Sequence, residues 1–383
     1  MKTAYFQFNV GRVSLSTQMS FMNNMEPLLK EISSSLDMLR QNNIQSVVLY
    51  DEILEKYYKP DARKNRSQYL YNLTIISLYG LFEQFIESQI EIFAKKIAIV
   101  VKKYSLLPQK MQAVHSDLTL KYAQRNLEDR YIPQHDKIKN HNSLIISLYK
   151  TLESNHDDFS LFEKVYSSHT ANFRYDLITS LFNNIGIERV IDKTLGIDSC
   201  KNHYINYFGL DDSAEHAEIA NKLSEEILDL VQRRNRIAHG EIEDDLLSFD
   251  LLSDKCIFFD FLCKGISDIT EQSMQYYLYK SEIIRDCAFD LKSPQQIFPQ
   301  MCAFGFSIKG LEVDLHGKYI YEGQTVYLSS QTSELIEKHT IDSIYYNGAS
   351  DSIFTTTKDF EFAIKLKNVT DVKPYKKMYF IFG

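Results

Sequence analysis

The segment 67–104 is the feature that most constrains the fold of this chain. Its apolar side chains point to nearly every side of the helix that their spacing predicts: Leu73, Ile75, Ile76, Leu78, Leu81, Phe82, Phe85, Ile86, Ile90, Ile92, Phe93 and Ile97. A helix without a polar face must be covered by other helices. Apolar stripes at steps of three and four residues in 22–39 and 255–287 can supply that cover. We therefore expect a mainly helical bundle with this segment at its centre.

One acidic residue interrupts the apolar pattern of this central helix. Glu83 has Tyr79 four residues before it and Ile86 three residues after it, so it shares their face. A buried carboxylate must be protonated or paired. Two interpretations stay open: either Glu83 pairs with Arg234 inside the bundle, or it lies at the rim and reaches water.

A second helix is predicted to end in Arg233-Arg234-Asn235-Arg236-Ile237-Ala238-His239-Gly240. Its apolar face recurs at helical spacing, at Leu223, Ile227, Leu230, Val231 and Ile237. Gly240 can adopt the left-handed conformation that closes a helix. Upstream, Asp211-Asp212-Ser213 offers an N-cap with acidic residues in the first turn.

The end of this helix gathers three kinds of polar group. Asn235 and His239 are four residues apart and share a face, while Arg234 continues the apolar stripe. A fixed cation, a hydrogen-bond donor and a group that titrates near neutrality suit phosphodiester chemistry. No carboxylate or cysteine joins them locally, and the chain has no phosphate-binding glycine loop or zinc-binding motif, so we expect no metal and no cofactor.

The run Arg234-Asn235-x-x-x-His239 resembles the motif of the HEPN superfamily, whose active members are metal-independent ribonucleases. The fuller run to Glu241 looks most like the branch associated with toxin and anti-phage systems. The resemblance implies catalytic roles for Arg234, Asn235 and His239, with Glu83 supporting the arginine. It also implies a homodimer in which two motifs face one cleft.

The function expected from this resemblance is that of an endoribonuclease that leaves 2′,3′-cyclic phosphate ends, acting as a toxin or anti-phage defence effector. Its expected partners are RNA (tRNA or mRNA), a second copy of the chain, and a cognate antitoxin or defence-system protein. The alternative is a non-catalytic HEPN module that binds RNA or a protein partner in a defence complex.

Composition supports a cytoplasmic protein without a membrane partner. The five cysteines form no C-x-x-C pair, and no apolar run approaches membrane-spanning length. The formal charge of −8 argues against a protein that coats nucleic acid along its whole surface, but it leaves room for a local basic groove.

Beyond about residue 293 the periodicity changes to two, as in Phe304 and Phe306, in 325–329 and in 360–366. Glycine turn signals separate these runs, which predicts a small antiparallel β-barrel. The fold class is therefore α+β, with a helical HEPN-like domain in 1–292, an insertion of shorter polar helices at about 105–210, and a barrel-like domain in 293–383. Alternation in 5–15 predicts a further strand or hairpin, and 56–66, which contains Pro60, is expected to be a basic connector.

Overall fold

A computed structural model describes residues 2–41, 60–101, 103–153, 159–241, 245–280, 289–290, 293–307, 319–330, 336–346, 349–351, 353–355, 361–369, 372 and 378–382. Contacts within the chain define two compact units. One comprises Met1–Ile92 and Tyr166–Ile269, and the other comprises Phe93–Val165 and Thr270–Gly383. The domain boundary at about residue 292 stays a prediction.

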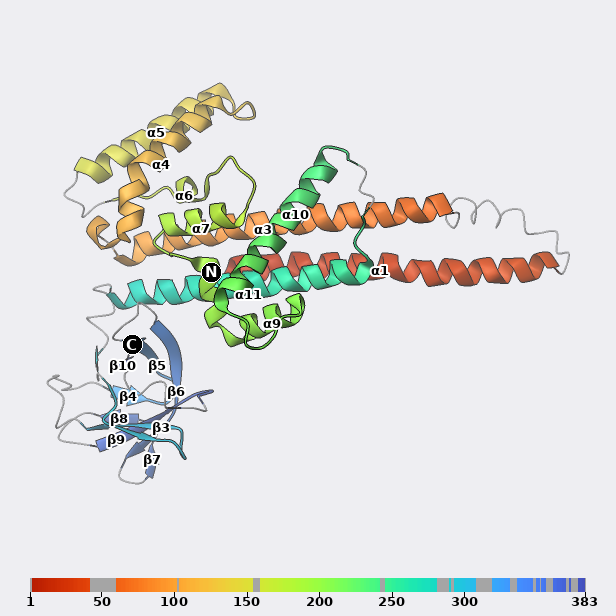
Figure 1. Ribbon diagram of the computed structural model, residues 1–383. Coiled ribbons are helices and arrows are strands. Elements are labelled where there is room, and N and C mark those ends of the chain that lie inside the picture. Colours follow the sequence, from red (N-terminus) through yellow and green to blue (C-terminus); the bar gives the residue numbers. More distant parts are fainter. Residues whose placement is uncertain are drawn as a thin grey trace. The chain divides into compact units, whose positions relative to one another are not determined.

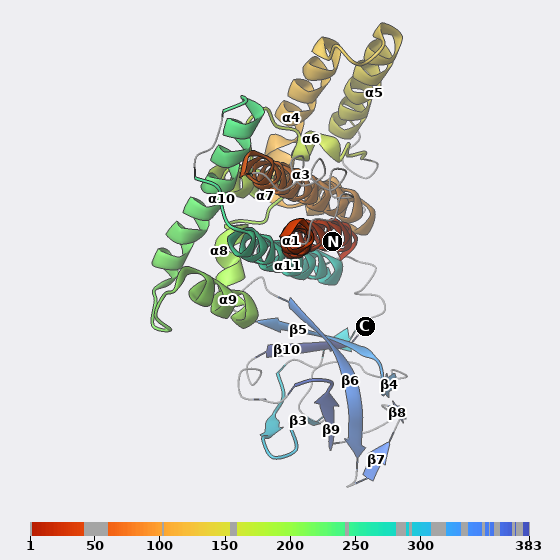
Figure 2. The same ribbon diagram turned by 90° about the vertical axis from the view of Figure 1, so that its right-hand side faces the viewer.

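Three long helices lie side by side in the first unit (Figure 1, Figure 2). They are α1 (Lys2–Gln41), α3 (Pro60–Val101) and α11 (Phe249–Lys280). The C-terminal ends of α3 and α11 belong to the second unit. The ring of Phe8 on α1 lies 5.7 Å from that of Phe85 on α3. The ring of Phe82, also on α3, lies 5.0 Å from that of Phe259 on α11. Helix α3 is thus covered by both neighbours, which confirms its predicted place inside a helical bundle.

The predicted strand at 5–15 is wrong, because these residues belong to α1. The helix buries Ala4, Phe8, Leu15 and Met19 at helical spacing but leaves Phe6, Val10 and Val13 exposed. These exposed apolar residues imitate the alternation of a strand. Gly11 serves close helix packing, since a Cβ atom there would lie 2.4 Å from Cδ2 of Leu81 on α3.

The predicted connector also needs correction. Pro60 is the first residue of α3, a position where its missing N–H costs no helical hydrogen bond. Residues 56–59 lie outside the described part of the chain.

Shorter helices follow along the chain: α6 (Lys164–Ser167), α7 (Tyr175–Asn184), α8 (Val190–Lys193), η3 (Thr194–Gly196), α9 (Asp198–Phe208) and α10 (His216–Ala238). Helix α10 carries the motif and buries the predicted stripe of Leu223, Ile227 and Leu230. Its predicted N-cap is wrong, because Glu215 occupies that position. Asp211 instead accepts a hydrogen bond from the backbone N–H of Ser213 (3.4 Å) in the turn before the helix.

The second unit contains a helical pair and a β-rich region. The pair consists of α4 (Gln109–Glu128) and α5 (Gln134–Glu153), which pack against each other. In the sequence, the short helix η2 (Tyr104–Leu106) precedes α4. These are the short helices predicted after residue 105. None of the described helices has the length and apolarity needed to cross a membrane.

The β-rich region is antiparallel throughout its described pairs. Its strands are β1 (Phe289–Asp290), β2 (Gln296–Phe298), β3 (Ala303–Ser307), β4 (Tyr319–Tyr321), β5 (Thr325–Ser330), β6 (Ile336–Tyr346), β7 (Ala349–Asp351), β8 (Ile353–Thr355), β9 (Glu361–Leu366) and β10 (Met378–Phe382). The alternating runs predicted around Phe304, at 325–329 and at 360–366 correspond to β3, β5 and β9.

The prediction of a barrel is wrong. The described sheet has the open order β1-β10-β5-β6-β9-β3-β2, with β7 beside β6 and a separate β4-β8 pair. Barrel closure requires the two outermost strands to pair, and alternation along single strands carries no information about that pairing. Strand β6 pairs with β5 through its first half and with β9 through its second half, and the register shifts between Ile341 and Ser343. Side chains from β3, β4, β5, β6 and β9 form the apolar core of this region.

Candidate active site

The candidate site is built on the last turn of α10 and the residues that close it. His239 occupies the C-cap, and Gly240 follows with a φ of +75°. The backbone N–H of Gly240 donates to the carbonyl of Ile237, and that of Glu241 donates to the carbonyl of Arg236, both at 3.0 Å. This pair of bonds is the Schellman closure, so the predicted role of Gly240 is confirmed. The closure leaves the His239 side chain exposed at the end of the helix.

Arg234 lies half-buried against an aromatic ring of α3. Its guanidinium carbon is 4.7 Å from the centre of the Tyr79 ring, and its Nη1 donates to Oδ1 of Asn235 (3.1 Å). Burial raises the pKa of Tyr79, so its phenol stays neutral. Among the described residues the Arg234 cation lies over a neutral ring and has no ion pair, so its charge is available to an anionic ligand.

Glu83 reaches this arginine through Tyr79. The Tyr79 hydroxyl donates to Oε1 of Glu83 at 3.5 Å. The ring of the same tyrosine lies beneath the guanidinium of Arg234. Among the described side chains, no direct ion pair joins Glu83 to Arg234. Glu83 is half-buried, between the two settings considered for it from sequence.

Glu83 is also the first of three carboxylates on one face of α3. Glu87 and Glu91 follow at intervals of four residues, the spacing that places side chains one above another. Ser167 donates to Oε1 of Glu91 (2.8 Å), and Nε2 of His169 lies 3.2 Å from Oε1 of Glu87. These contacts attach the end of α6 and the residues after it to this acidic face.

We name residues 167–173 the clasp, because they contact both helices of the candidate site. Nδ2 of Asn172 donates to Oδ1 of Asn235 on α10 (3.3 Å). The backbone N–H of Phe173 donates to the Tyr79 hydroxyl on α3 (3.3 Å). The clasp was missed in the sequence, where no periodicity or motif distinguishes it from the other polar segments.

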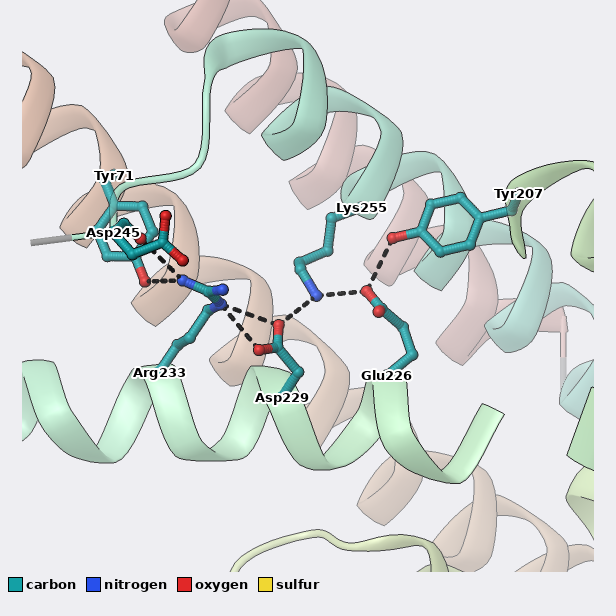
Figure 3. A network of polar contacts seen from close by, with 7 residues as sticks. All are labelled: Tyr71, Tyr207, Glu226, Asp229, Arg233, Asp245 and Lys255. Carbon is teal, nitrogen blue, oxygen red and sulfur yellow. Dashed lines mark hydrogen bonds and ion pairs between the residues drawn. The ribbon is translucent and has the colours of Figure 1, made fainter. Parts of the chain in front are cut away.

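The preceding residue of the motif, Arg233, points into the protein interior (Figure 3). Its Nε donates to both carboxylate oxygens of Asp229 (2.9 and 3.0 Å). Its Nη1 donates to the Tyr71 hydroxyl (2.9 Å) and to the carbonyl of Asp245 (3.2 Å). The network therefore ties α10 to α3 and to the loop that follows the motif.

The same network continues to a buried lysine. Nζ of Lys255, on α11, donates to Asp229 (2.8 Å) and contacts Glu226, which also accepts a bond from the Tyr207 hydroxyl (2.8 Å). The Lys255 side chain is 4% exposed. Two cations and two carboxylates balance, which offsets much of the cost of burying each charge.

The pKa values in this network follow the pairing. Burial opposes ionisation of Asp229, but Lys255 and Arg233 outweigh it and lower its pKa. Burial likewise acts against the Arg233 cation, yet its bonds to Tyr71 and Asp229 raise its pKa. The charges of Asp229 and Arg233 are therefore fixed at neutral pH, as a structural ion pair requires.

The arginine that enters the buried stripe is thus Arg233, which is 9% exposed, and not Arg234 as expected from spacing. Both positions border the same stripe, three and four residues after Leu230. In the sequence, the residue that distinguishes Arg233 from Arg234 is Asp229, which lies four residues before Arg233 at the spacing of a helical ion pair. Lys255 could have been found by the argument applied to Glu83, since Leu252 and Phe259 flank it at helical spacing.

Metal ligation has no group of side chains to support it in the described part of the chain. No three His, Cys, Asp or Glu residues there lie close enough to share a metal ion. Four cysteines in the described part of the chain are free thiols, and three of these are buried: Cys200, Cys256 and Cys263. Burial raises the pKa of each of these three thiols, which keeps them protonated.

Comparison with known protein families gives a match that covers this helical region. The model of the RiboL-PSP-HEPN family matches residues 43–272, more than half of the chain, including α3, the clasp and α10. No curated protein and no solved structure matches the chain significantly. At the level of the family, the match supports a nuclease or other RNA-related role. The chain therefore belongs to the RiboL-PSP-HEPN family of the HEPN superfamily.

Proposed function

We propose that this chain is a metal-independent endoribonuclease that serves as a toxin or an anti-phage defence effector. One observation carries the proposal. A guanidinium resting on a neutral ring, an amide bonded to it and an exposed imidazole are gathered at the closed end of one helix. The RNA-related role of the family supports the choice of substrate.

The cleavage step uses His239 as its proton carrier. The imidazole accepts the proton of the ribose 2′-hydroxyl, and the 2′-oxygen forms a bond to the adjacent phosphorus. The bond from phosphorus to the 5′-oxygen breaks, and that oxygen takes up a proton. The products are a 2′,3′-cyclic phosphate and a 5′-hydroxyl, and no metal or redox partner is required.

In this proposal Arg234 and Asn235 bind the phosphate of the RNA. A planar guanidinium can donate two parallel bonds to phosphate oxygens and stabilise the charge that develops there. The Oδ1 atom of Asn235 already accepts bonds from Arg234 and from Asn172. No bond from its Nδ2 to a described residue is present, so the Nδ2 hydrogens are available to an acceptor such as a phosphate oxygen.

Two copies of the chain complete the site in this proposal. Cleavage needs one proton accepted and one donated, whereas each chain places one exposed imidazole, that of His239, at the end of α10. A homodimer with facing motifs supplies both. The substrate is tRNA or mRNA, and an antitoxin or defence-system protein controls the activity.

The test is to incubate the purified full chain with tRNA and with mRNA in the presence of EDTA. We expect the wild type to cleave, leaving cyclic-phosphate ends, and His239→Ala and Arg234→Ala to be inactive. His216→Ala at the other end of α10 and Arg130→Ala, both exposed, are matched controls that should cleave normally.

Equal cleavage by all variants would place the activity at another site. RNA binding without cleavage by any of them, including the wild type, would establish the non-catalytic module instead.

A further inference from the structure

His169 is the anchor of the clasp, and both of its ring nitrogens face hydrogen-bond acceptors. Nδ1 lies 2.7 Å from the carbonyl of Ala171, and Nε2 lies 3.2 Å from the carboxylate of Glu87. A neutral imidazole carries one N–H and one lone pair, so it can satisfy only one of these acceptors. An imidazolium satisfies both. The two acceptors therefore match the imidazolium form of His169, whose side chain is 12% exposed.

The charged groups around the ring favour the same form. From α3, Glu87 bonds to the ring, Glu83 acts on it electrostatically, and Glu91 bonds to Ser167 of the clasp. On α10, the guanidinium of Arg234 lies over the ring of Tyr79. The bond to Glu87 raises the pKa of His169 against burial, which lowers it.

We propose that His169 is a positioning residue of the candidate site: as an imidazolium it fastens the clasp to α3 and so keeps Asn172 bonded to Asn235. It acts through the backbone that joins it to Asn172, three residues on, and to Phe173, whose ring contacts its own at 4.2 Å between centroids. It is not a second proton carrier, because both of its nitrogens are engaged within the chain. The catalytic consequence rests on the proposed function, whereas the fastening itself does not.

The proposal gives the clasp a definite pH dependence. A histidine whose pKa is raised on folding contributes its full stabilisation below its ordinary value of 6.5. That stabilisation is lost as the pH rises through the raised value in the folded chain. Above it, the neutral ring can hold only one acceptor, the clasp opens, and Asn235 loses one of its two donors.

Limited digestion with trypsin tests the fastening directly, without RNA. Arg174 follows the clasp immediately and is exposed, so the bond between Arg174 and Tyr175 reports on clasp opening. The bond between Arg130 and Tyr131 joins the same two residue types at another exposed position and serves as the internal reference for trypsin at each pH.

In the wild type, the ratio of cleavage at Arg174 to cleavage at Arg130 should rise about tenfold from neutral to alkaline pH, the ratio that one charge-assisted bond supports. His169→Gln, which is neutral, should show the high ratio at every pH. His169→Lys, whose ammonium keeps its charge up to about pH 10, should show the low ratio over that whole range. A flat ratio in the wild type, or a His169→Gln variant that behaves like the wild type, would overturn the proposal.

The effect on RNA cleavage is tested by pH profiles of kcat and KM. We expect the alkaline fall in wild-type kcat to be smaller in His169→Lys, because the part caused by clasp opening is removed while the part caused by loss of the proton-donating imidazole remains. His169→Gln should lower kcat where the wild-type clasp is closed and match the wild type at alkaline pH, where that clasp is open. Asn172→Ala should cause a similar loss, and combining it with His169→Gln should add little, because both changes break the same connection.

Additive losses would show that His169 acts independently of Asn172 and would overturn the proposal. If the wild type cleaves no RNA, the proposed function fails, and the tryptic ratio still decides whether His169 fastens the clasp.

Discussion

Arg233 and Arg234 are neighbours in the sequence and have opposite settings in the structure. Arg233 donates to a carboxylate, a phenol and a backbone carbonyl and is almost fully buried. Arg234 lies half-buried on an aromatic ring and donates to one amide within the described chain. Successive helical residues are about 100° apart around the axis, so fixing one inward turns the other toward the candidate site.

This comparison teaches how to separate a structural from a functional arginine. The donors of Arg233 are directed at partners in the protein, and its charge is balanced by Asp229 in a network that includes Lys255 (Figure 3). Arg234 is held in place by a contact that consumes no charge. The network on one face of α10 therefore sets the rotation of the helix, and the other face presents a cation.

The largest effect is expected from Arg233→Met, which should break the structural side of the comparison. Removing one partner of a buried pair leaves Asp229 short of a cation and should lower the free energy of unfolding by about 3–5 kcal/mol. Urea unfolding measures this loss. Arg189→Met, which removes an exposed arginine paired with Asp192, is the control and should cause no measurable change. A small loss for Arg233→Met would show that the network is dispensable.

Arg234→Met should reverse this pattern. We expect RNA cleavage to fall by about 10²–10³-fold, as for loss of a group that stabilises transition-state charge, with little change in urea unfolding. Arg234→Lys should recover only part of the rate, because lysine lacks the planar fork. A loss of stability equal to that of Arg233→Met would erase the distinction between the two arginines.

Gly240→Ala tests the turn that ends the motif. A Cβ atom at this position meets no atom within 4 Å, so the cost comes from the left-handed backbone alone. We expect a loss of about 1–2 kcal/mol in the free energy of unfolding. Gly80→Ala, in the middle of α3 and equally uncrowded, is the control and should stabilise the chain by about 0.5–1 kcal/mol. Equal effects of the two changes would mean that Gly240 is not held in the left-handed conformation.

The smallest effect on the free energy of unfolding is expected when Asp229 is protonated at acid pH. The pKa of Asp229 is lowered on folding, so its contribution is complete above the ordinary value of 3.8 and is lost as the pH falls through the lower value in the folded chain. Asp229→Asn should remove this part of the pH dependence of unfolding. If the variant and the wild type lose stability in parallel at acid pH, Asp229 does not titrate with its network.

Features set by local spacing could be predicted from the sequence. The apolar stripes of α3 and α10, the closure at Gly240 and the strands β3, β5 and β9 all depend on residues within one or two turns of one another. Alternation failed at the start of α1 because exposed Phe6 and Val10 broke the rule that apolar residues are buried. Strand spacing likewise could not show which strands form the edges of the sheet.

The support around the candidate site could not be predicted for a different reason. The clasp joins residues 63 positions apart in Asn172 and Asn235, 82 apart in His169 and Glu87, and 94 apart in Phe173 and Tyr79. Such contacts depend on how helices pack and leave no periodic trace in the chain. Apolar spacing located the motif helix but could not show which of two adjacent arginines turns inward.

The closure of α10 also provides a probe that needs no substrate. The backbone N–H groups of Gly240 and Glu241 are both hydrogen-bonded to carbonyls of the last helical turn. Their hydrogens can exchange with solvent deuterium only when that turn opens. Exchange rates at these two amides therefore report how firmly the backbone beside His239 is held, in each variant, before any RNA is added.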